Sequence, residues 1–143
     1  MTILFSNPPW WEGKESRGFL KKKRWRRGVR AGSRWPFTYL GRCEPDKSRA
    51  RDYIPYPFFL GYAATYIQEK IGNNNVFFRD SIALSESYKS YFSYLENIKN
   101  KIEYILIESA TPSWEHDYSL IKKIKSKYNH IKIFPSDITI GSI

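Results

Sequence analysis

Short apolar runs alternate with segments of helical period through most of this chain. The runs are "TILF" at 2–5, "NVFFRD" at 75–80, "EYILIES" at 103–109 and "HIKIF" at 130–134. Between them, apolar residues recur at helical spacing in segments that begin near residues 57, 88 and 113. Alternation of this kind is typical of a parallel sheet covered by helices on both faces. The sequence therefore predicts a flavodoxin- or Rossmann-like α/β protein with three layers and a parallel sheet of about four strands.

The helix ends carry their own signals. Gly72, followed by three asparagines, is expected to end the first helix. Ser113 is expected to cap the third helix, whose first turn holds Glu115 and Asp117, where the helix dipole favours acids. The same reasoning makes His116 a residue of an exposed first turn, and we expect it to be solvated rather than catalytic.

The region from Glu12 to Pro57 looks different. It is rich in Gly, Pro, Arg and Lys, shows no sustained period, and predicts one long basic loop after the first strand. Between Lys14 and Arg51 there are 14 Lys and Arg against 3 acids, whereas the rest of the chain is nearly neutral. Trp25 and Trp35 here, with Trp10 and Trp11 just before the region, suggest that the loop covers an apolar surface.

Length and composition narrow the class of protein. A chain of 143 residues suits a single domain, 1–143. One cysteine, Cys43, excludes an internal disulfide framework and fits a reducing cytoplasm. The start "MTILFSNPP" resembles neither a signal peptide nor a membrane anchor. The sequence contains no GxGxxG, GxxxxGK[ST] or GxSxG motif, and it predicts neither a catalytic constellation nor a metal site.

The expected fold points to one edge of the sheet. Ligands of such sheets bind outside the carboxyl ends of the strands. The segments there are "SNPPW", "RDS", "ESATPS" and "PSD", and the basic loop leaves from the same edge. We therefore expect the loop to cover the site. Structural roles remain open alternatives: a turn at residues 7–9, a helix cap at 111–113, a routine loop carboxylate at Asp80, and backbone bonds for the Glu108 carboxylate.

Four segments in order carry a resemblance to a known family. "ILFSNPPW", "YPFFLGYAATYI", "VFFRDSIA" and "YILIESATPSWEHD" resemble the N-terminal cobalamin-binding domain of cobalamin-dependent radical-SAM proteins, and "RAGSRWP" is similar to a segment of a subset of that family. The similarity covers nearly the whole chain.

The resemblance implies a cofactor and a site. The cofactor is cobalamin, held at the carboxyl edge by tryptophans over its ring, by backbone groups on its amides and by an arginine on its phosphate. By position, the cofactor-binding residues would be Asn7, Pro8, Pro9, Trp10, Arg30, Gly32, Ser33, Arg34, Trp35, Glu108, Ser109, Ala110, Thr111, Pro112 and Ser113.

The chain departs from the family in three places. It lacks the DxHxxG motif that supplies a histidine to cobalt in methionine-synthase-like domains, and the CxxxCxxC motif of the iron–sulfur cluster. It also ends after the fourth expected strand, where the family domain continues. We therefore expect a truncated piece of a larger enzyme, in which the iron–sulfur cluster and S-adenosylmethionine belong to a radical-SAM core in a missing C-terminal part.

Two other functions were weighed. The basic, tryptophan-containing run "KKKRWRRGVRAGSR" suits a module that binds nucleic acid through its phosphates. A response-regulator-like or flavodoxin-like interaction domain fits the fold, but the acidic cluster of a phosphoacceptor is missing after the first strand.

Overall fold

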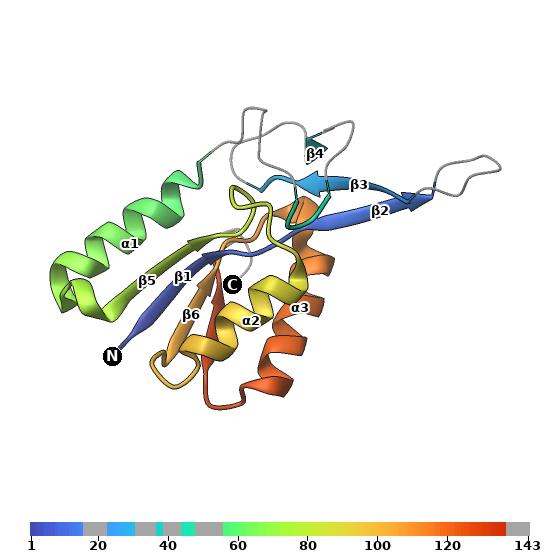
Figure 1. The fold of residues 1–143 in the computed structure, drawn as a ribbon. Coiled ribbons are helices and arrows are strands. Elements are labelled where there is room, and N and C mark those ends of the chain that lie inside the picture. Colours follow the sequence, from blue (N-terminus) through green and yellow to red (C-terminus); the bar gives the residue numbers. More distant parts are fainter. Residues whose placement is uncertain (16–22, 31–36, 39–43, 48–55, 137–143) are drawn as a thin grey trace.

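The computed structural model describes residues 1–15, 23–30, 37–38, 44–47 and 56–136. Its main sheet has four parallel strands in the order β5-β1-β6-β7 (Figure 1). Their bounds are β1 Ile3–Asn7, β5 Val76–Asp80, β6 Tyr104–Ile107 and β7 Lys132–Pro135. The parallel sheet of four strands predicted from the sequence is confirmed.

Helices lie on both faces of this sheet. They are α1 Phe58–Ile71, α2 Tyr88–Ile98 and α3 Trp114–Lys127, with short 3₁₀ turns η1 at Asn73–Asn75 and η2 at Thr111–Ser113. Figure 1 shows α1 on one side of the sheet, and α2 and α3 on the other. The three-layer α/β/α architecture is therefore present. Among the described residues, no helix combines the length and apolar character that a membrane span requires.

The alternation of side chains along β1 creates two apolar cores. Leu4 points to the larger core, which it shares with residues of α2 and α3 such as Leu95 and Ile124. Phe5, the next residue, points to the opposite face and packs against Leu60 of α1. Side chains of β6 also point alternately to the two cores. Because both faces of this strand are covered by apolar residues, its consecutive residues Ile105, Leu106 and Ile107 are all apolar.

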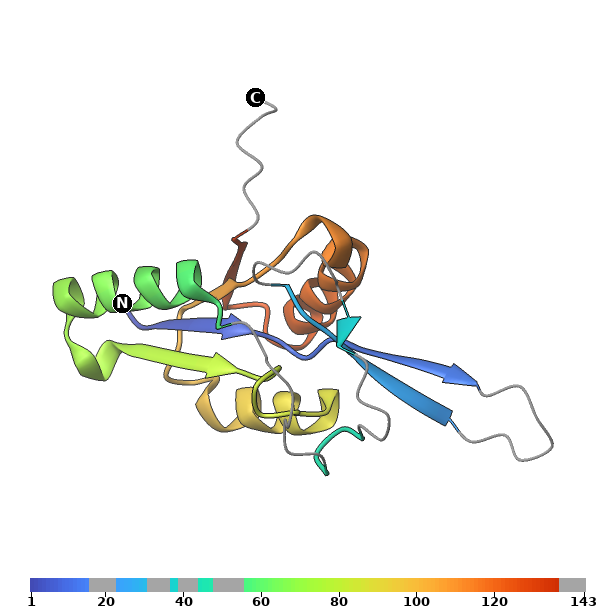
Figure 2. The ribbon, with the colours of Figure 1, turned by 90° about the horizontal axis from the view of Figure 1, so that it is seen from above.

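The region expected to be one irregular loop contains a second sheet, so that part of the prediction is wrong. Strands β2 Trp11–Glu15, β3 Lys23–Gly28 and β4 Phe37–Thr38 form an antiparallel sheet in the order β2-β3-β4. Figures 1 and 2 show β2 and β3 extending beyond the main sheet as an arm. Lysine and glycine are depleted in strands, but strand propensity depends strongly on context, and β3 forms here in its pairing with β2.

Candidate ligand site at the carboxyl edge

The strand order places a candidate site between β1 and β6. The second parallel strand in the chain, β5, lies on one side of β1, and the third, β6, lies on the other. The strand order therefore reverses at the carboxyl ends of β1 and β6, which is where open α/β sheets bind ligands. Asn7 to Pro9 leave β1 at this point, and Glu108 to Ser113 leave β6 beside them.

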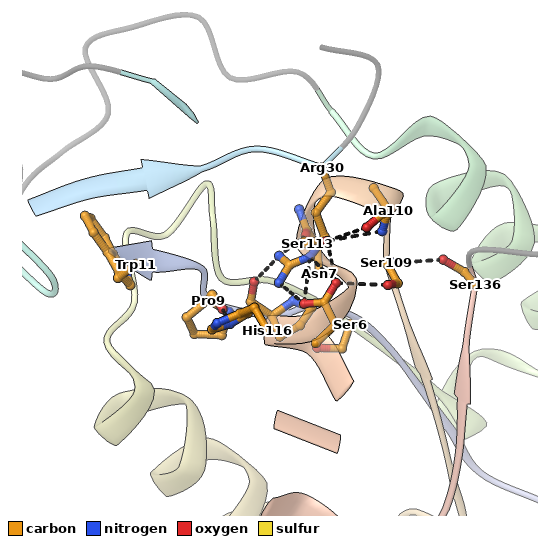
Figure 3. Close-up of polar contacts among 12 residues, drawn as sticks. Ser6, Asn7, Pro9, Trp11, Arg30, Ser109, Ala110, Ser113, His116 and Ser136 are labelled. Atoms are coloured by element: carbon orange, nitrogen blue, oxygen red, sulfur yellow. Dashed lines mark hydrogen bonds and ion pairs between the residues drawn. The ribbon is translucent and has the colours of Figure 1, made fainter. Parts of the chain in front are cut away.

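Arg30 returns from the basic region to this edge. Its guanidinium donates to Asn7 Oδ1 at 3.2 Å and to the carbonyl of Pro8 at 2.6 Å. It also forms an ion pair with Asp117, with 2.5 Å between Nη2 and Oδ1, and both side chains are 0% exposed. Figure 3 shows Arg30 reaching down into the group of residues that follows β1. The basic region is therefore folded back onto the sheet edge at this residue.

Asp117 joins Arg30 to the loop after β6. The hydroxyl of Ser109 donates to Asp117 Oδ2 at 2.9 Å, and that of Ser113 donates to the same oxygen at 2.5 Å. Ser113 Oγ also accepts from the backbone N–H of Ala110 at 3.2 Å. A buried carboxylate requires partners of this kind, and Asp117 receives them from the neighbouring loop after β6 and from Arg30, which is 87 positions away in the chain.

Ser113 differs from its predicted role. It occupies the position before α3, but its hydroxyl makes no capping bond to a backbone N–H of that helix. The hydroxyl is bound to Asp117 instead. Ser113 is therefore the cap residue by position, as predicted, but the expected side-chain cap is absent: its hydroxyl donates to Asp117 and accepts from the Ala110 N–H, which lies outside α3.

Asn7 connects the ends of β1 and β5. Its side-chain amide N–H donates to Asp80 Oδ1 at 3.0 Å, and its backbone carbonyl accepts from the backbone N–H of Ser81. Asp80 Oδ1 also accepts from the backbone N–H groups of Ile82 and Ala83, both at 3.1 Å. Burial raises the pKa of Asp80 in spite of these bonds. Its carboxylate thus organises the turn after β5.

The hairpin of β2 and β3 is anchored to the loop between β5 and α2. The indole N–H of Trp11 donates to the carbonyl of Glu86 at 2.6 Å. Arg27, which is fully buried, donates to the carbonyl of Ile82 at 3.0 Å and to Ser85 Oγ at 2.6 Å. Trp11 and Arg27 are directly paired across the two strands. One cross-strand pair therefore attaches the hairpin to the α/β body.

His116 is half-buried, so the expectation of a solvated histidine is wrong. Its Nε2 lies 3.0 Å from Tyr88 Oη and 3.3 Å from the carbonyl oxygen of Pro9, and its ring stacks on Trp10 at 6.2 Å. Burial, followed by the charge of Arg30, lowers the pKa of His116. The side chain therefore packs as a neutral group beneath the start of the hairpin.

The predicted residues divide into a buried base and an accessible surface. Thr111 and Pro112 are exposed and Ala110 is half-buried. The remaining described members are buried, namely Asn7, Pro8, Pro9, Trp10, Arg30, Glu108, Ser109 and Ser113. The predicted residues Gly32, Ser33, Arg34 and Trp35 lie outside the described residues, so their assignment stays a prediction. Trp114, 43% exposed, directly follows η2 and enlarges the accessible surface.

Sequence reasoning missed the role of Asp117. It placed this residue only as an acid favoured by the helix dipole in a first turn, yet the same helical period offered a signal. Positions 113, 117, 120 and 124 fall on one face of α3, and Leu120 and Ile124 belong to the core. An acid on a buried helical stripe indicates a buried partner, here Arg30.

No family model, curated protein or solved structure matches this chain. Within the described parts of the chain, no three His, Cys, Asp or Glu side chains are grouped to hold a metal ion.

Proposed function

We propose that this chain binds a corrinoid at the carboxyl edge of its sheet, as the N-terminal accessory domain of a cytoplasmic cobalamin-dependent radical-SAM enzyme such as a methyltransferase. One observation carries the proposal. Three of the sequence segments that resemble the family, around Asn7, Arg30 and Ser109 to Ser113, meet in one hydrogen-bonded network at the strand-order reversal.

The residues at the edge fit a corrinoid in their chemistry. Cobalamin presents a flat, partly apolar ring with amide side chains. Trp114 offers a partly exposed aromatic face, and Thr111 offers an exposed hydroxyl close to it in the chain. The bound corrinoid would supply cobalt-centred chemistry, whereas the iron–sulfur cluster and S-adenosylmethionine would belong to a radical-SAM core outside this chain. The residues described here would bind and orient the ring.

In this proposal Arg30 does not contact the phosphate of the cofactor directly. Its guanidinium is already engaged by Asp117, Asn7 and the Pro8 carbonyl, and it is buried. Arg30 would therefore support the surface from below. A contact to the nucleotide phosphate would fall instead to Arg34, which lies outside the described residues.

The alternative function, nucleic-acid binding, rests on the positive charge of the basic region, but several of its arginines are engaged within the protein. Arg26 pairs with Glu12 across the hairpin, Arg27 is buried against the loop after β5, and Arg30 is paired with Asp117. A guanidinium held inside the protein does not displace counterions from a phosphate backbone. The basic composition of this region therefore overstates the charge available to a nucleic acid.

The proposal is tested by titrating the purified chain with hydroxocobalamin and recording the visible spectrum, with equilibrium dialysis as a second readout. Thr111→Arg introduces a long charged side chain at the carboxyl edge and should weaken binding at least about tenfold, equivalent to about 1.4 kcal/mol. Asn100→Arg is the matched control, because Asn100 is also exposed but lies before β6, at the opposite edge. Equal binding by both variants, or no binding by the wild-type chain, would contradict the proposal.

Salt dependence separates the two functions. Nucleic-acid binding through about six phosphate contacts should weaken on the order of a thousandfold between 50 and 200 mM salt. Corrinoid binding, with a single phosphate, should change little over the same range. A fluorescently labelled RNA that binds tightly with a steep salt slope, combined with a chain that leaves the cobalamin spectrum unchanged, would favour the alternative.

A further inference from the structure

We infer that Asp117 is the positioning residue of the carboxyl-edge site, holding the loop after β6 and the segment after β3 in place at the same time. As a statement about ligand binding, this inference rests on the proposed function. Asp117 itself is 0% exposed, so it acts through its neighbours and not by touching a ligand.

Asp117 stands on a rigid support. It lies in the first turn of α3, and the same helix buries Leu120 and Ile124 in the larger core. A carboxylate on a packed helix is held more precisely than one on a loop. The groups that bind to Asp117 are therefore ordered relative to the sheet.

On one side, Asp117 fixes the loop that carries the accessible surface. Ser109 and Ser113 flank Ala110, Thr111 and Pro112, and both hydroxyls donate to Asp117 Oδ2. The loop is thus attached at both ends to one oxygen atom. Because the exposed residues Thr111 and Pro112 lie between these attachments, their orientation depends on the carboxylate that holds the loop.

On the other side, Asp117 fixes the segment after β3 through Arg30. Arg30 approaches the carboxylate with both Nε and Nη2, and it donates to the carbonyl of Pro8 through Nη1. Serine hydroxyls alone do not neutralise a buried carboxylate, whereas the guanidinium does. The two halves of the network therefore require each other, and a change at Asp117 should disturb both segments together.

The test compares Asp117→Asn with a matched control, Glu86→Gln. Glu86 is also a buried carboxylate with one arginine and one serine partner: Arg79 Nε lies at 3.1 Å and Ser81 Oγ at 2.6 Å. Both variants remove one buried negative charge and keep the side-chain shape. Only Asp117→Asn should weaken hydroxocobalamin binding, by on the order of tenfold to a hundredfold, the range seen when the hydrogen-bond partners of metal-ligating side chains are removed. Equal losses in the two variants would overturn the inference.

Backbone amide hydrogen exchange tests the inference without a ligand. The N–H of Gly28 is bonded to the Trp10 carbonyl, and the N–H of Ala110 to Ser113 Oγ. In Asp117→Asn, exchange at both amides should accelerate at least about tenfold, which corresponds to about 1.4 kcal/mol of lost protection. Glu86→Gln should leave both rates within about twofold of the wild type. Acceleration at only one amide would show that Asp117 does not link the two segments.

A milder variant covers the case in which Asp117→Asn does not fold. Ser109→Ala removes one hydroxyl donor and leaves the ion pair with Arg30 intact. It should accelerate exchange at Ala110 and leave Gly28 unchanged. If the wild-type chain binds no cobalamin, the proposed function fails, and the exchange experiment still decides whether Asp117 links the two segments.

Discussion

Replacing Gly28 by alanine tests how the hairpin is seated on the body. A Cβ atom at Gly28 would lie 2.0 Å from Cδ2 and 2.1 Å from Cε3 of the Trp10 indole. Ordinary contact begins near 3.4 Å, so the two groups would have to separate by about 1.4 Å. The indole has little room to move, because it is 2% exposed and contacts both the His116 ring and the guanidinium of Arg30.

The expected cost follows from this confinement. Overpacking of a filled interior destabilises a protein by about 1–3 kcal/mol, and a clash with a confined ring belongs at the upper end, about 3 kcal/mol. With a urea m-value of about 2 kcal/mol/M, the unfolding midpoint should fall by about 1.5 M. The measurement is urea unfolding of both proteins followed by far-UV circular dichroism.

Gly61→Ala is the matched control in the same assay. Its Cβ would lie 2.5 Å from Tyr56 Oη, but that ring is 48% exposed and can rotate towards solvent. Gly61 also lies within α1, where alanine is favoured over glycine by about 0.8–1 kcal/mol. Gly61→Ala should therefore remain within about 1 kcal/mol of the wild type. Similar midpoints for Gly28→Ala and Gly61→Ala would refute the steric argument.

Three further outcomes are expected from single side chains. Because burial lowers the pKa of His116 below its ordinary value of 6.5, the unfolded chain binds more protons, so stability should fall as the pH drops through 6.5 and level off below the folded pKa; His116→Gln should flatten this part of a pH series of urea midpoints. Ser87→Ala removes the side chain that accepts from the Ser90 N–H at the start of α2 and should cost about 1 kcal/mol by urea unfolding, with an unchanged midpoint refuting the cap. Tyr91→Phe leaves the buried hydroxyl of Ser6 without its 2.8 Å partner and should cost about 1–3 kcal/mol by thermal unfolding, while adding Ser6→Ala should recover part of the loss.

The location of the candidate site could be predicted from the sequence, but the buried contacts that hold its residues in place could not. A parallel sheet brings the carboxyl ends of its strands to one edge, so residues 7–9 and 108–113 could be grouped from their order alone. Arg30 joined them in the prediction only through the family resemblance. Its actual partner, Asp117, lies 87 positions away in the chain and was predicted only as an acid favoured by the helix dipole. Neither its burial nor its pairing follows from local sequence.

The strands of the basic region could not be predicted from local sequence either. The sequence contains no apolar alternation at 23–28, and the strand there forms because β2 supplies backbone partners and Arg27 finds acceptors in the loop before α2. A charged side chain can be buried when carbonyl and hydroxyl groups from elsewhere in the chain accept its hydrogen bonds. The residues near Arg27 in the sequence do not indicate that such acceptors will be present.

The amino-acid sequence by itself determined which segments become the four parallel strands and the three helices, and in what order they follow along the chain. The reason is that the spacing of apolar residues is a local property, and these residues are buried on folding. The tertiary structure alone decided which strands pair beside β1 and that the basic region forms a hairpin. It also decided that Arg27, Arg30 and Asp117 are buried and His116 is half-buried. The reason is that the free energy of a buried polar group depends on partners that only folding brings within hydrogen-bonding distance.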